Sequence, residues 1–364
     1  MTPKPTLAVV GATGAAGSVM LRMLTQRADV WGGIRLVSSP RSAGRKAEVR
    51  GEECEILALG EEVFDGVDLA LFLVPEAVAA RWAPVAVSKG AVVVDTSAAF
   101  RDDPDVPLVV PEINAHAARV RPRGIVASPG CTALALIMAV GALHAEFGLT
   151  ELVVTAQQAA GGAGAGRAGV ETLRAQLGLV AGGGELGTRP GDVRRAVGDG
   201  TGPFPGPLAL NVLPWSGTAG ADGASSEEER IRDETRRILG RPALRISATC
   251  VRVPVVAGHS VSVHARFERP VEVGRAHEVL ATAPGVVLFD DPAAGGFPTP
   301  ADVAGTDPAW VGRVRRSMDD ERALDLFVCA DNLRKGGALN ALQIAETVVA
   351  ATAESVFVGS VNDL

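Results

Sequence analysis

The sequence predicts an α/β fold, with a doubly wound parallel sheet in the first part of the chain and an α+β domain after it. Two observations lead to this prediction. Short apolar strands alternate with helix-like segments over the first 130 residues, which is the βαβ pattern of a parallel sheet. Beyond that point the pattern changes to longer β-rich runs. The length of 364 residues suits two domains at roughly 150 residues each.

The N-terminal domain is expected to cover residues 1–130. Its first strand is the apolar run 7–10, followed by a glycine-rich turn and a segment with helical spacing of apolar residues. The further strands are expected at residues 34–39, 67–74, 91–95 and 124–127, with a helix near 77–88.

The second domain is expected to cover residues 131–332. It opens with a helix over 132–147, with Gly148 as the C-cap. The β-rich runs follow at residues 151–158, 244–256 and 260–268. The glycine-rich segment 181–206 is either an excursion from this domain or a mobile loop. A strong helix over 338–351 lies in the C-terminal segment 333–364, which we expect to complete the first domain.

Composition excludes several classes of protein. Acidic residues outnumber basic ones by 42 to 35, for a net charge of −7, which argues against binding nucleic acid or an anionic membrane. The longest apolar stretch, residues 133–143, is shorter than the roughly 20 residues of a membrane span. Four scattered cysteines suggest neither a disulfide framework nor a metal site. Without a signal-peptide core, the expected location is the cytoplasm.

A glycine-rich turn between the first strand and the first helix predicts a dinucleotide site. The helix N-terminus would offer free N–H groups and a positive dipole end to a pyrophosphate, as in a Rossmann-type domain. The alternative is a tight turn that needs glycine for packing alone. The residues expected at the cofactor are Gly11, Ala12, Thr13, Gly14, Ala15, Ala16 and Gly17.

The end of the second strand favours NADP over NAD. An NAD site usually has a carboxylate there for the ribose 2′-hydroxyl. This chain has Ser38, Ser39 and, shortly after, Arg41, which suit a 2′-phosphate. The alternative for Arg41 is a solvated loop charge.

Cys131 is the candidate nucleophile. It follows Pro129 and Gly130 and opens an apolar helix, where the helix dipole stabilises a thiolate. The alternative is a small buried residue. Cys250 is the rival thiol, but its surroundings suggest a strand interior. Of the five histidines, His259 lies at a turn between two strands, where it either points into a cleft or is solvated.

Several polar residues could bind a ligand. Gln158 ends a strand beside glycines, and Arg252 lies on the strand that leads to His259. Arg101 and Arg230 are candidate anion-binding residues, and Glu227 is a carboxylate at the start of a helix. Spacing alone allows a capping role for Gln158 and a helix-start role for Glu227.

These motifs together resemble the aspartate-semialdehyde dehydrogenase family over nearly the whole chain. The resemblance is carried by the glycine turn, the run 100–114, the turn at 129–131, Gln158 with its glycines, the acidic helix start at 227–228, Arg252-Val253-Pro254-Val255 with Gly258-His259-Ser260, and the segment 331–341.

The resemblance implies a phosphorylating aldehyde dehydrogenase that interconverts L-aspartate 4-semialdehyde, phosphate and NADP with 4-aspartyl phosphate and NADPH. It implies a homodimer or homotetramer in which the second domain carries catalysis and dimerisation. The implied roles are Cys131 as nucleophile, His259 as general acid/base, Gln158 orienting the adduct, Arg252 and Glu227 holding the amino acid, Arg101 and Arg230 holding phosphate, and Ser42, Gly161 and Asn332 at the cofactor.

Some positions depart from the family pattern and define the alternatives. Gly130 stands where asparagine is common, Gln157 where tyrosine is usual, Gly161 in place of a serine, and Arg230 in place of a lysine. The Pro-Gly-Cys turn and the loop 73–76 lean toward N-acetyl-glutamyl-phosphate reductases. A reductase of that kind, or a catalytically silent member that acts as a binding partner, is the alternative hypothesis.

Overall fold

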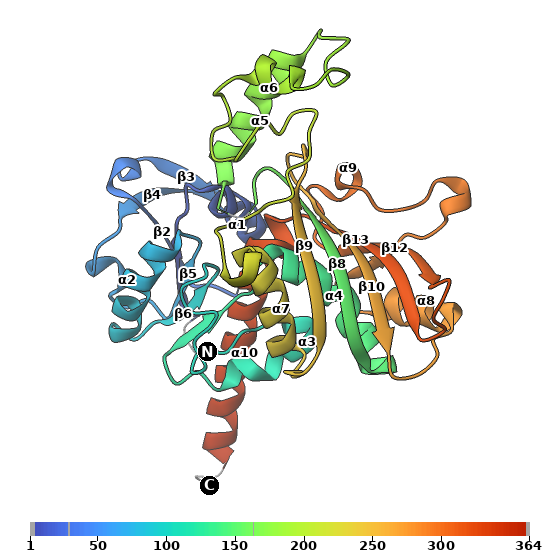
Figure 1. The fold of residues 1–364 in the computed structure, drawn as a ribbon. Coiled ribbons are helices and arrows are strands. Elements are labelled where there is room, and N and C mark those ends of the chain that lie inside the picture. Colours follow the sequence, from blue (N-terminus) through green and yellow to red (C-terminus); the bar gives the residue numbers. More distant parts are fainter. Residues whose placement is uncertain (1–3, 28–29, 163, 362–364) are drawn as a thin grey trace. The chain divides into compact units, whose positions relative to one another are not determined.

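The computed structural model describes residues 4–27, 30–162 and 164–361. The chain divides into two compact units, Met1–Gly130 with Gly336–Leu364 and Cys131–Lys335. Figure 1 shows both, with the first unit in blue to teal plus the red C-terminal helix, and the second in green to orange-red. Each unit contains one sheet.

The sheet of the first unit has seven strands in the order β3-β4-β2-β1-β5-β6-β7. All neighbours are parallel except β3 and β4, which pair antiparallel. The strand order reverses at β1, which is where doubly wound sheets bind nucleotides. The bounds are β1 (Thr6–Val10), β2 (Gly33–Ser38), β3 (Lys46–Val49), β4 (Glu52–Ala58), β5 (Leu69–Phe72), β6 (Val92–Asp95) and β7 (Ile125–Ala127).

The helices of the first unit bury apolar faces against this sheet. In α1 (Ala15–Gln26) the buried residues recur with helical spacing, among them Val19, Met20, Met23 and Leu24. The C-terminal helix α10 (Asn340–Val361) belongs to the same unit, because the buried Asn340 amide donates to Val109 O and Ser128 Oγ. The other helices are α2 (Glu76–Ser88) and the short α3 (Pro111–Asn114).

The second unit has a mixed six-stranded sheet in the order β11-β12-β13-β10-β8-β9. Strands β8 and β9 pair parallel, and β10 pairs antiparallel with both β8 and β13. The helix α4 (Cys131–Phe147) is almost wholly buried and packs on β8, β10 and β13. The strand bounds are β8 (Leu149–Gln158), β9 (Arg245–Arg252), β10 (His259–Phe267), β11 (Val286–Leu288), β12 (Ala309–Arg316) and β13 (Ala323–Ala330). The remaining main helices are α5 (Gly166–Val180), α6 (Asp192–Val197), α7 (Ser226–Ile238), α8 (Val273–Thr282) and α9 (Pro300–Val303).

The predicted fold class, a Rossmann-type sheet followed by an α+β unit, is confirmed, but some local predictions are corrected. Strand β9 ends at Arg252 rather than at residue 256. His259 is the first residue of β10 and fully buried, so it is not a solvated turn residue. The hairpin β3–β4 and the strands β11 to β13 had no sequence prediction.

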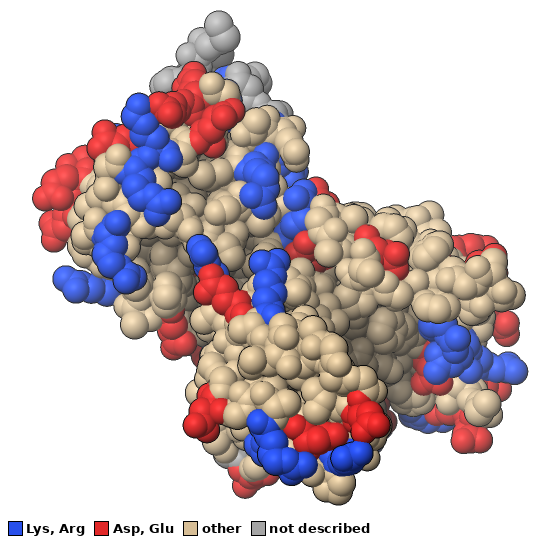
Figure 2. Space-filling model, turned by 90° about the horizontal axis from the view of Figure 1, so that it is seen from above, with Lys and Arg blue, Asp and Glu red and all other residues tan. Residues whose placement is uncertain are grey.

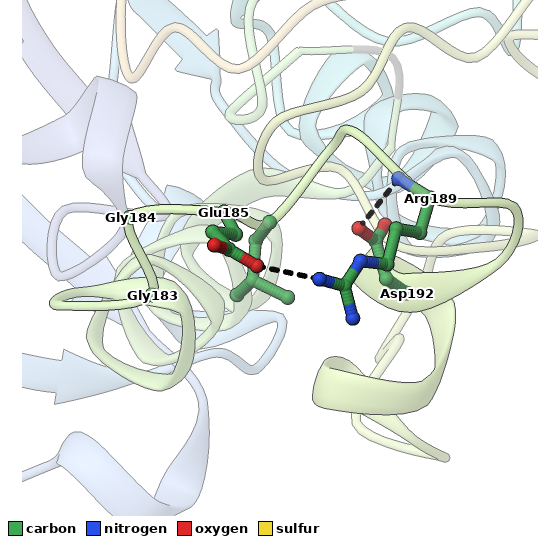
Figure 3. A pocket seen from close by; sticks show the side chains of 6 residues that line it. Gly183, Gly184, Glu185, Arg189 and Asp192 are labelled. Carbon is green, nitrogen blue, oxygen red and sulfur yellow. Dashed lines mark hydrogen bonds and ion pairs between the residues drawn. The ribbon is translucent and has the colours of Figure 1, made fainter.

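The glycine-rich segment 181–206 is not a bare loop. It carries α6, and Val197 and Phe204 are buried in a small core with Leu173 of α5. A shallow pocket on this segment is lined by residues 183–186, Arg189 and Asp192, and Figure 3 shows the ion pair between Arg189 and Glu185 there. The charged side chains that line the pocket already contact one another or the backbone of the same segment.

Three properties of the described residues bear on function. On the face seen in Figure 2, basic and acidic side chains are interspersed and separated by uncharged surface. Within the described part of the chain, no helix combines the length and the apolar character that a membrane crossing requires. The same residues contain no group of three or more His, Cys, Asp or Glu side chains placed to hold a metal ion.

Candidate active site

Cys131 and His259 are in contact. Cys131 is the first residue of α4, and its Sγ lies 3.1 Å from Nε2 of His259, at the start of β10. The two residues are 128 positions apart, and the packing of α4 on β10 brings them together. A thiol beside an imidazole at the first turn of a helix is the arrangement of a cysteine nucleophile.

The ring of His259 is held on its other side by the backbone. The amide N–H of Ala159 donates to Nδ1 of His259 at 3.1 Å. Burial, with the positive charge of Arg252 adding to it, lowers the pKa of His259 to about 3. Gly162 lies against the ring, and a Cβ on it would come within 2.6 Å of Nε2. The ring is therefore buried and enclosed by the loop 159–162.

Arg252 holds this same loop. Its Nη1 donates to the carbonyl oxygens of Ala159 at 2.8 Å and Gly162 at 3.0 Å, and its Nη2 donates to Ser216 Oγ at 2.8 Å. Burial lowers the pKa of the Arg252 guanidinium, which nevertheless keeps its charge. Three of its five N–H groups are used in these contacts, so two are left for a carboxylate ligand.

Gln158 is fully buried at the end of β8 and bonded through both ends of its amide. Its Nε2 donates to Thr132 Oγ1 at 2.8 Å and to Glu227 Oε2 at 3.2 Å, and its Oε1 accepts from Ser216 Oγ. Because Arg252 can only donate, Ser216 accepts from it and must use its one hydroxyl hydrogen for Gln158. This direction of bonding determines which end of the amide faces Glu227.

Glu227 and Arg230 form an ion pair on the first turns of α7. Arg230 Nη1 lies 2.8 Å from Glu227 Oε1, and the Glu227 side chain is only 13% exposed. The structure thus brings together, within the second unit, six of the predicted residues: Cys131, Gln158, Glu227, Arg230, Arg252 and His259.

The other cysteines described are poor nucleophiles. Burial raises the pKa of the Cys250 thiol far above its usual value, and nearby Glu227 and Glu228 raise it further. Burial also raises the pKa of the Cys329 thiol to about 11, although Ser260 contacts it. The Cys54 thiol pKa is also raised, by burial and then by Glu52.

The glycine turn has the shape of a dinucleotide cradle. A Cβ on Gly11 would run into the Leu73 carbonyl, and one on Gly17 into the Gly11 carbonyl. Gly11 also has a φ of +93°, which favours glycine. No acidic residue lies in the first turn of α1, so its N-terminal amides face no competing carboxylate there. These residues fit a bound pyrophosphate.

The residues expected at the cofactor's ribose lie beside this turn. Ser38 ends β2, and its Oγ is 2.7 Å from Thr13 Oγ1. Ser39 and Arg41 are exposed, and Arg41 and Ser42 lie in a 3₁₀ turn. No carboxylate occupies the end of β2.

Three further predicted residues have structural contacts of their own. Asn332 is buried and accepts the backbone N–H of Gly258 at 3.0 Å, which anchors the approach to His259. Gly161 lies in the 159–162 loop, where a Cβ would meet Val170 at 3.2 Å. Arg101 belongs to the first unit, where its Nε donates to Ser128 O at 2.9 Å and its Nη2 to Thr96 O at 2.6 Å.

Sequence reasoning missed four groups that complete the site. They are the backbone amide of Ala159, the hydroxyls of Thr132 and Ser216, and the bare Cα of Gly162. The adjacency of Thr132 to the nucleophile was the one available signal. Ser216 lies 58 residues from Gln158, and no local pattern marks it.

Comparison with known proteins shows the family of the chain. Residues 6–120 match the family model of the semialdehyde dehydrogenase NAD binding domain, and residues 140–335 match that of the semialdehyde dehydrogenase dimerisation domain. The aspartate-semialdehyde dehydrogenase of Corynebacterium glutamicum is 44% identical over 351 residues, covering 94% of this chain and 99% of that protein. That of Streptomyces akiyoshiensis is also 44% identical, over 344 residues, with 94% and 98% covered.

Solved structures with a similar fold belong to the same family. The crystal structure of aspartate semialdehyde dehydrogenase II from Vibrio cholerae superposes with a TM-score of 0.86 at 34% identity, covering 95% of this chain and 98% of that one. A second structure of that enzyme, complexed with ASA, matches equally well. These relatives favour the predicted family over the N-acetyl-glutamyl-phosphate reductase alternative. The chain therefore belongs to the aspartate-semialdehyde dehydrogenase family of oxidoreductases.

Proposed function

We propose that the protein interconverts L-aspartate 4-semialdehyde, phosphate and NADP with 4-aspartyl phosphate and NADPH. The observation that carries the proposal is the contact of 3.1 Å between Cys131 Sγ and His259 Nε2 at the first residue of α4. The family membership supplies the substrate class, and the site supplies a nucleophile with groups that suit an amino acid. A binding protein would not need a cysteine nucleophile held against an imidazole.

The thiolate of Cys131 attacks the aldehyde carbon and later carries the acyl group as a thioester, which phosphate cleaves. His259, the general acid/base that the resemblance implies, lies against this sulfur. Gln158 is held rigidly by Thr132 and Ser216 and orients the adduct. The nicotinamide cofactor supplies the hydride acceptor when bound.

Two residues are suited to the charged ends of an amino acid. Arg252 keeps two N–H groups for the α-carboxylate after its internal contacts, and Glu227 provides a carboxylate for the α-ammonium. Arg101 and Arg230 are the proposed phosphate ligands. The variant Arg101→Ala should then raise the KM for phosphate far more than that for the semialdehyde, and Arg252→Ala should do the reverse.

The cofactor is proposed to be NADP. The glycine cradle at Gly11 to Gly17 and the N-terminus of α1 would hold its pyrophosphate, and Ser38, Ser39 and Arg41 its 2′-phosphate. We also propose that the enzyme is a homodimer, through the unit that matches a dimerisation domain, and that it works in the cytoplasm. Tetramer formation stays an alternative.

A single assay tests the proposed reaction. NADP reduction is followed with aspartate semialdehyde and with N-acetylglutamate semialdehyde, each with and without phosphate. We expect phosphate-dependent reduction with aspartate semialdehyde and far less with the acetylated substrate. Equal or greater turnover of the N-acetylated substrate, or no turnover of either, would refute the proposal.

A further inference from the structure

We propose that Phe204 is a positioning residue for Arg252, and that it thereby contributes to selectivity for substrates that carry an α-carboxylate. Its ring holds the guanidinium in place and keeps water from that side of it. The inference rests on the proposed function for the role of Arg252, whereas the contact between the two side chains belongs to the structure alone.

The guanidinium of Arg252 lies over an aromatic ring. Its carbon atom Cζ is 5.9 Å from the centroid of the Phe204 ring, and Arg252 and Phe204 are only 4% and 6% exposed. A guanidinium is attracted to an aromatic face at up to about 6 Å, and more strongly where water is excluded. A ring has no carbonyl or carboxylate oxygen, so it attracts the charge and leaves N–H groups for a carboxylate ligand. Phe204 therefore adds to the three hydrogen bonds of Arg252 without competing with the substrate.

Helix α5 brings the ring close to the loop that Arg252 bonds. Gly169 of α5 is the contact point, because a Cβ there would lie 3.1 Å from Cζ of Phe204 and would run into the carbonyl oxygen of Ala160. Gly202, two residues before the ring, has a φ of +55°, and a Cβ on it would run into the Thr172 side chain of the same helix. Two bare glycines thus let the chain around Phe204 pack directly on α5, next to the loop 159–162.

The backbone on both sides of Phe204 is anchored to α5 by one buried side chain. Gln176 is fully buried, and its Nε2 donates to the carbonyl oxygen of Gly200 at 2.9 Å. Its Oε1 accepts the N–H groups of Leu208 at 2.8 Å and Ala209 at 3.1 Å. Because Gly200 precedes the ring and Leu208 follows it, the segment cannot shift without breaking buried hydrogen bonds. The end of the glycine-rich segment 181–206 is therefore a fixed support for the ring.

The arrangement acts on the carboxylate end of a substrate. Charges attract more strongly where water is excluded, so a ring on one side of the guanidinium strengthens its pairing with a carboxylate. A substrate that has the same aldehyde and ammonium groups but no carboxylate gains nothing from this. If Phe204 only filled the small core with Val197 and Leu173, its loss would affect both kinds of substrate alike.

The test compares aspartate semialdehyde with 3-aminopropanal, which has the same aldehyde and ammonium groups without the carboxylate. Phe204→Leu keeps an apolar side chain and removes the aromatic face. We expect kcat/KM for aspartate semialdehyde to fall about 3- to 30-fold, mainly through a higher KM, with little change for 3-aminopropanal and in the KM for phosphate. An equal fall for both aldehydes, or no fall for either, would overturn the proposal.

Val197→Ala is the matched control, because Val197 is buried in the same small core. It should lower the unfolding temperature, as Phe204→Leu does, and leave the ratio of kcat/KM for the two aldehydes as in the wild type. A ratio that falls equally in the control would show that the general packing of this core sets the selectivity, and it would contradict the role of the ring.

Urea unfolding provides an arm that does not depend on the reaction. The free energy of unfolding is measured for the wild type, Phe204→Leu, Arg252→Gln and the double variant. Because the ring acts on the guanidinium, the loss in the double variant should be smaller than the sum of the two single losses, and additive losses would refute the positioning. A wild type that turns over neither aldehyde would refute the proposed function, and the unfolding cycle then decides the positioning alone. A wild type that uses both aldehydes equally well would overturn the selectivity.

Discussion

Replacing Gly162 with alanine should disable the site while the protein stays folded. The added Cβ would lie 2.6 Å from Nε2 of His259, whereas ordinary contact begins at 3.4 Å. The ring would have to move by about 1 Å, and a displacement of that size at a reacting group can cost about 100-fold in rate. The overpacking should lower the free energy of unfolding by about 1–3 kcal/mol.

The assay is kcat/KM for phosphate-dependent NADP reduction, measured beside thermal unfolding. The matched control is Gly178→Ala in α5, where an added Cβ meets no atom within 4 Å. The control should unfold at a slightly higher temperature, because alanine favours a helix over glycine by about 0.5–1 kcal/mol. It should also keep full activity. If Gly162→Ala also kept full activity, His259 would not need its observed position and the reasoning would be wrong.

The remaining predictions concern the nucleophile, the cofactor and the amide network. Alkylation of Cys131 should stop turnover and Cys131→Ser should be folded but inactive, whereas inactivation that tracks Cys250, whose pKa is raised by burial, would contradict the assignment. Wild-type kcat/KM should be higher with NADP than with NAD, and Arg41→Ala should reduce that preference; equal use of both by the wild type would refute it. Ser216→Ala should lower kcat and cost about 1–3 kcal/mol in stability, because it leaves the Gln158 carbonyl without its donor, and an unchanged kcat would show that Gln158 needs no such support.

Features with a strong local pattern could be predicted from the sequence. The βαβ alternation, the glycine turn before α1 and the apolar helix after Cys131 all depend on short-range spacing, and the structure has elements at each place. The pairing of Cys131 with His259 could be expected only through the family resemblance. Their contact arises because α4 packs on β10, which no local pattern contains.

Other features could not be read from the sequence because tertiary contacts create them. The amide of Ala159 has no side-chain signal, and its role appears only once Arg252 bonds the loop. Ser216 lies far from Gln158 in the sequence. The backbone of Leu213 pairs with that of Arg252, and this pairing places the Ser216 hydroxyl where it donates to the Gln158 side-chain carbonyl. Strand β12 was missed because arginines interrupt its apolar pattern, and its pairing with β13 shifts register around Arg313, which has a positive φ of 57°.

The central claim is that Cys131 carries the acyl group, and trapping that group tests it most directly. The protein is mixed with aspartate semialdehyde and NADP in the absence of phosphate, and the reaction is quenched in acid. The protein is then digested, and the masses of its peptides are measured by mass spectrometry. The account predicts an aspartyl mass on the Cys131 peptide that disappears when phosphate is added before the quench. A protein that turns over normally but shows the acyl group on another residue, or on none, would contradict it.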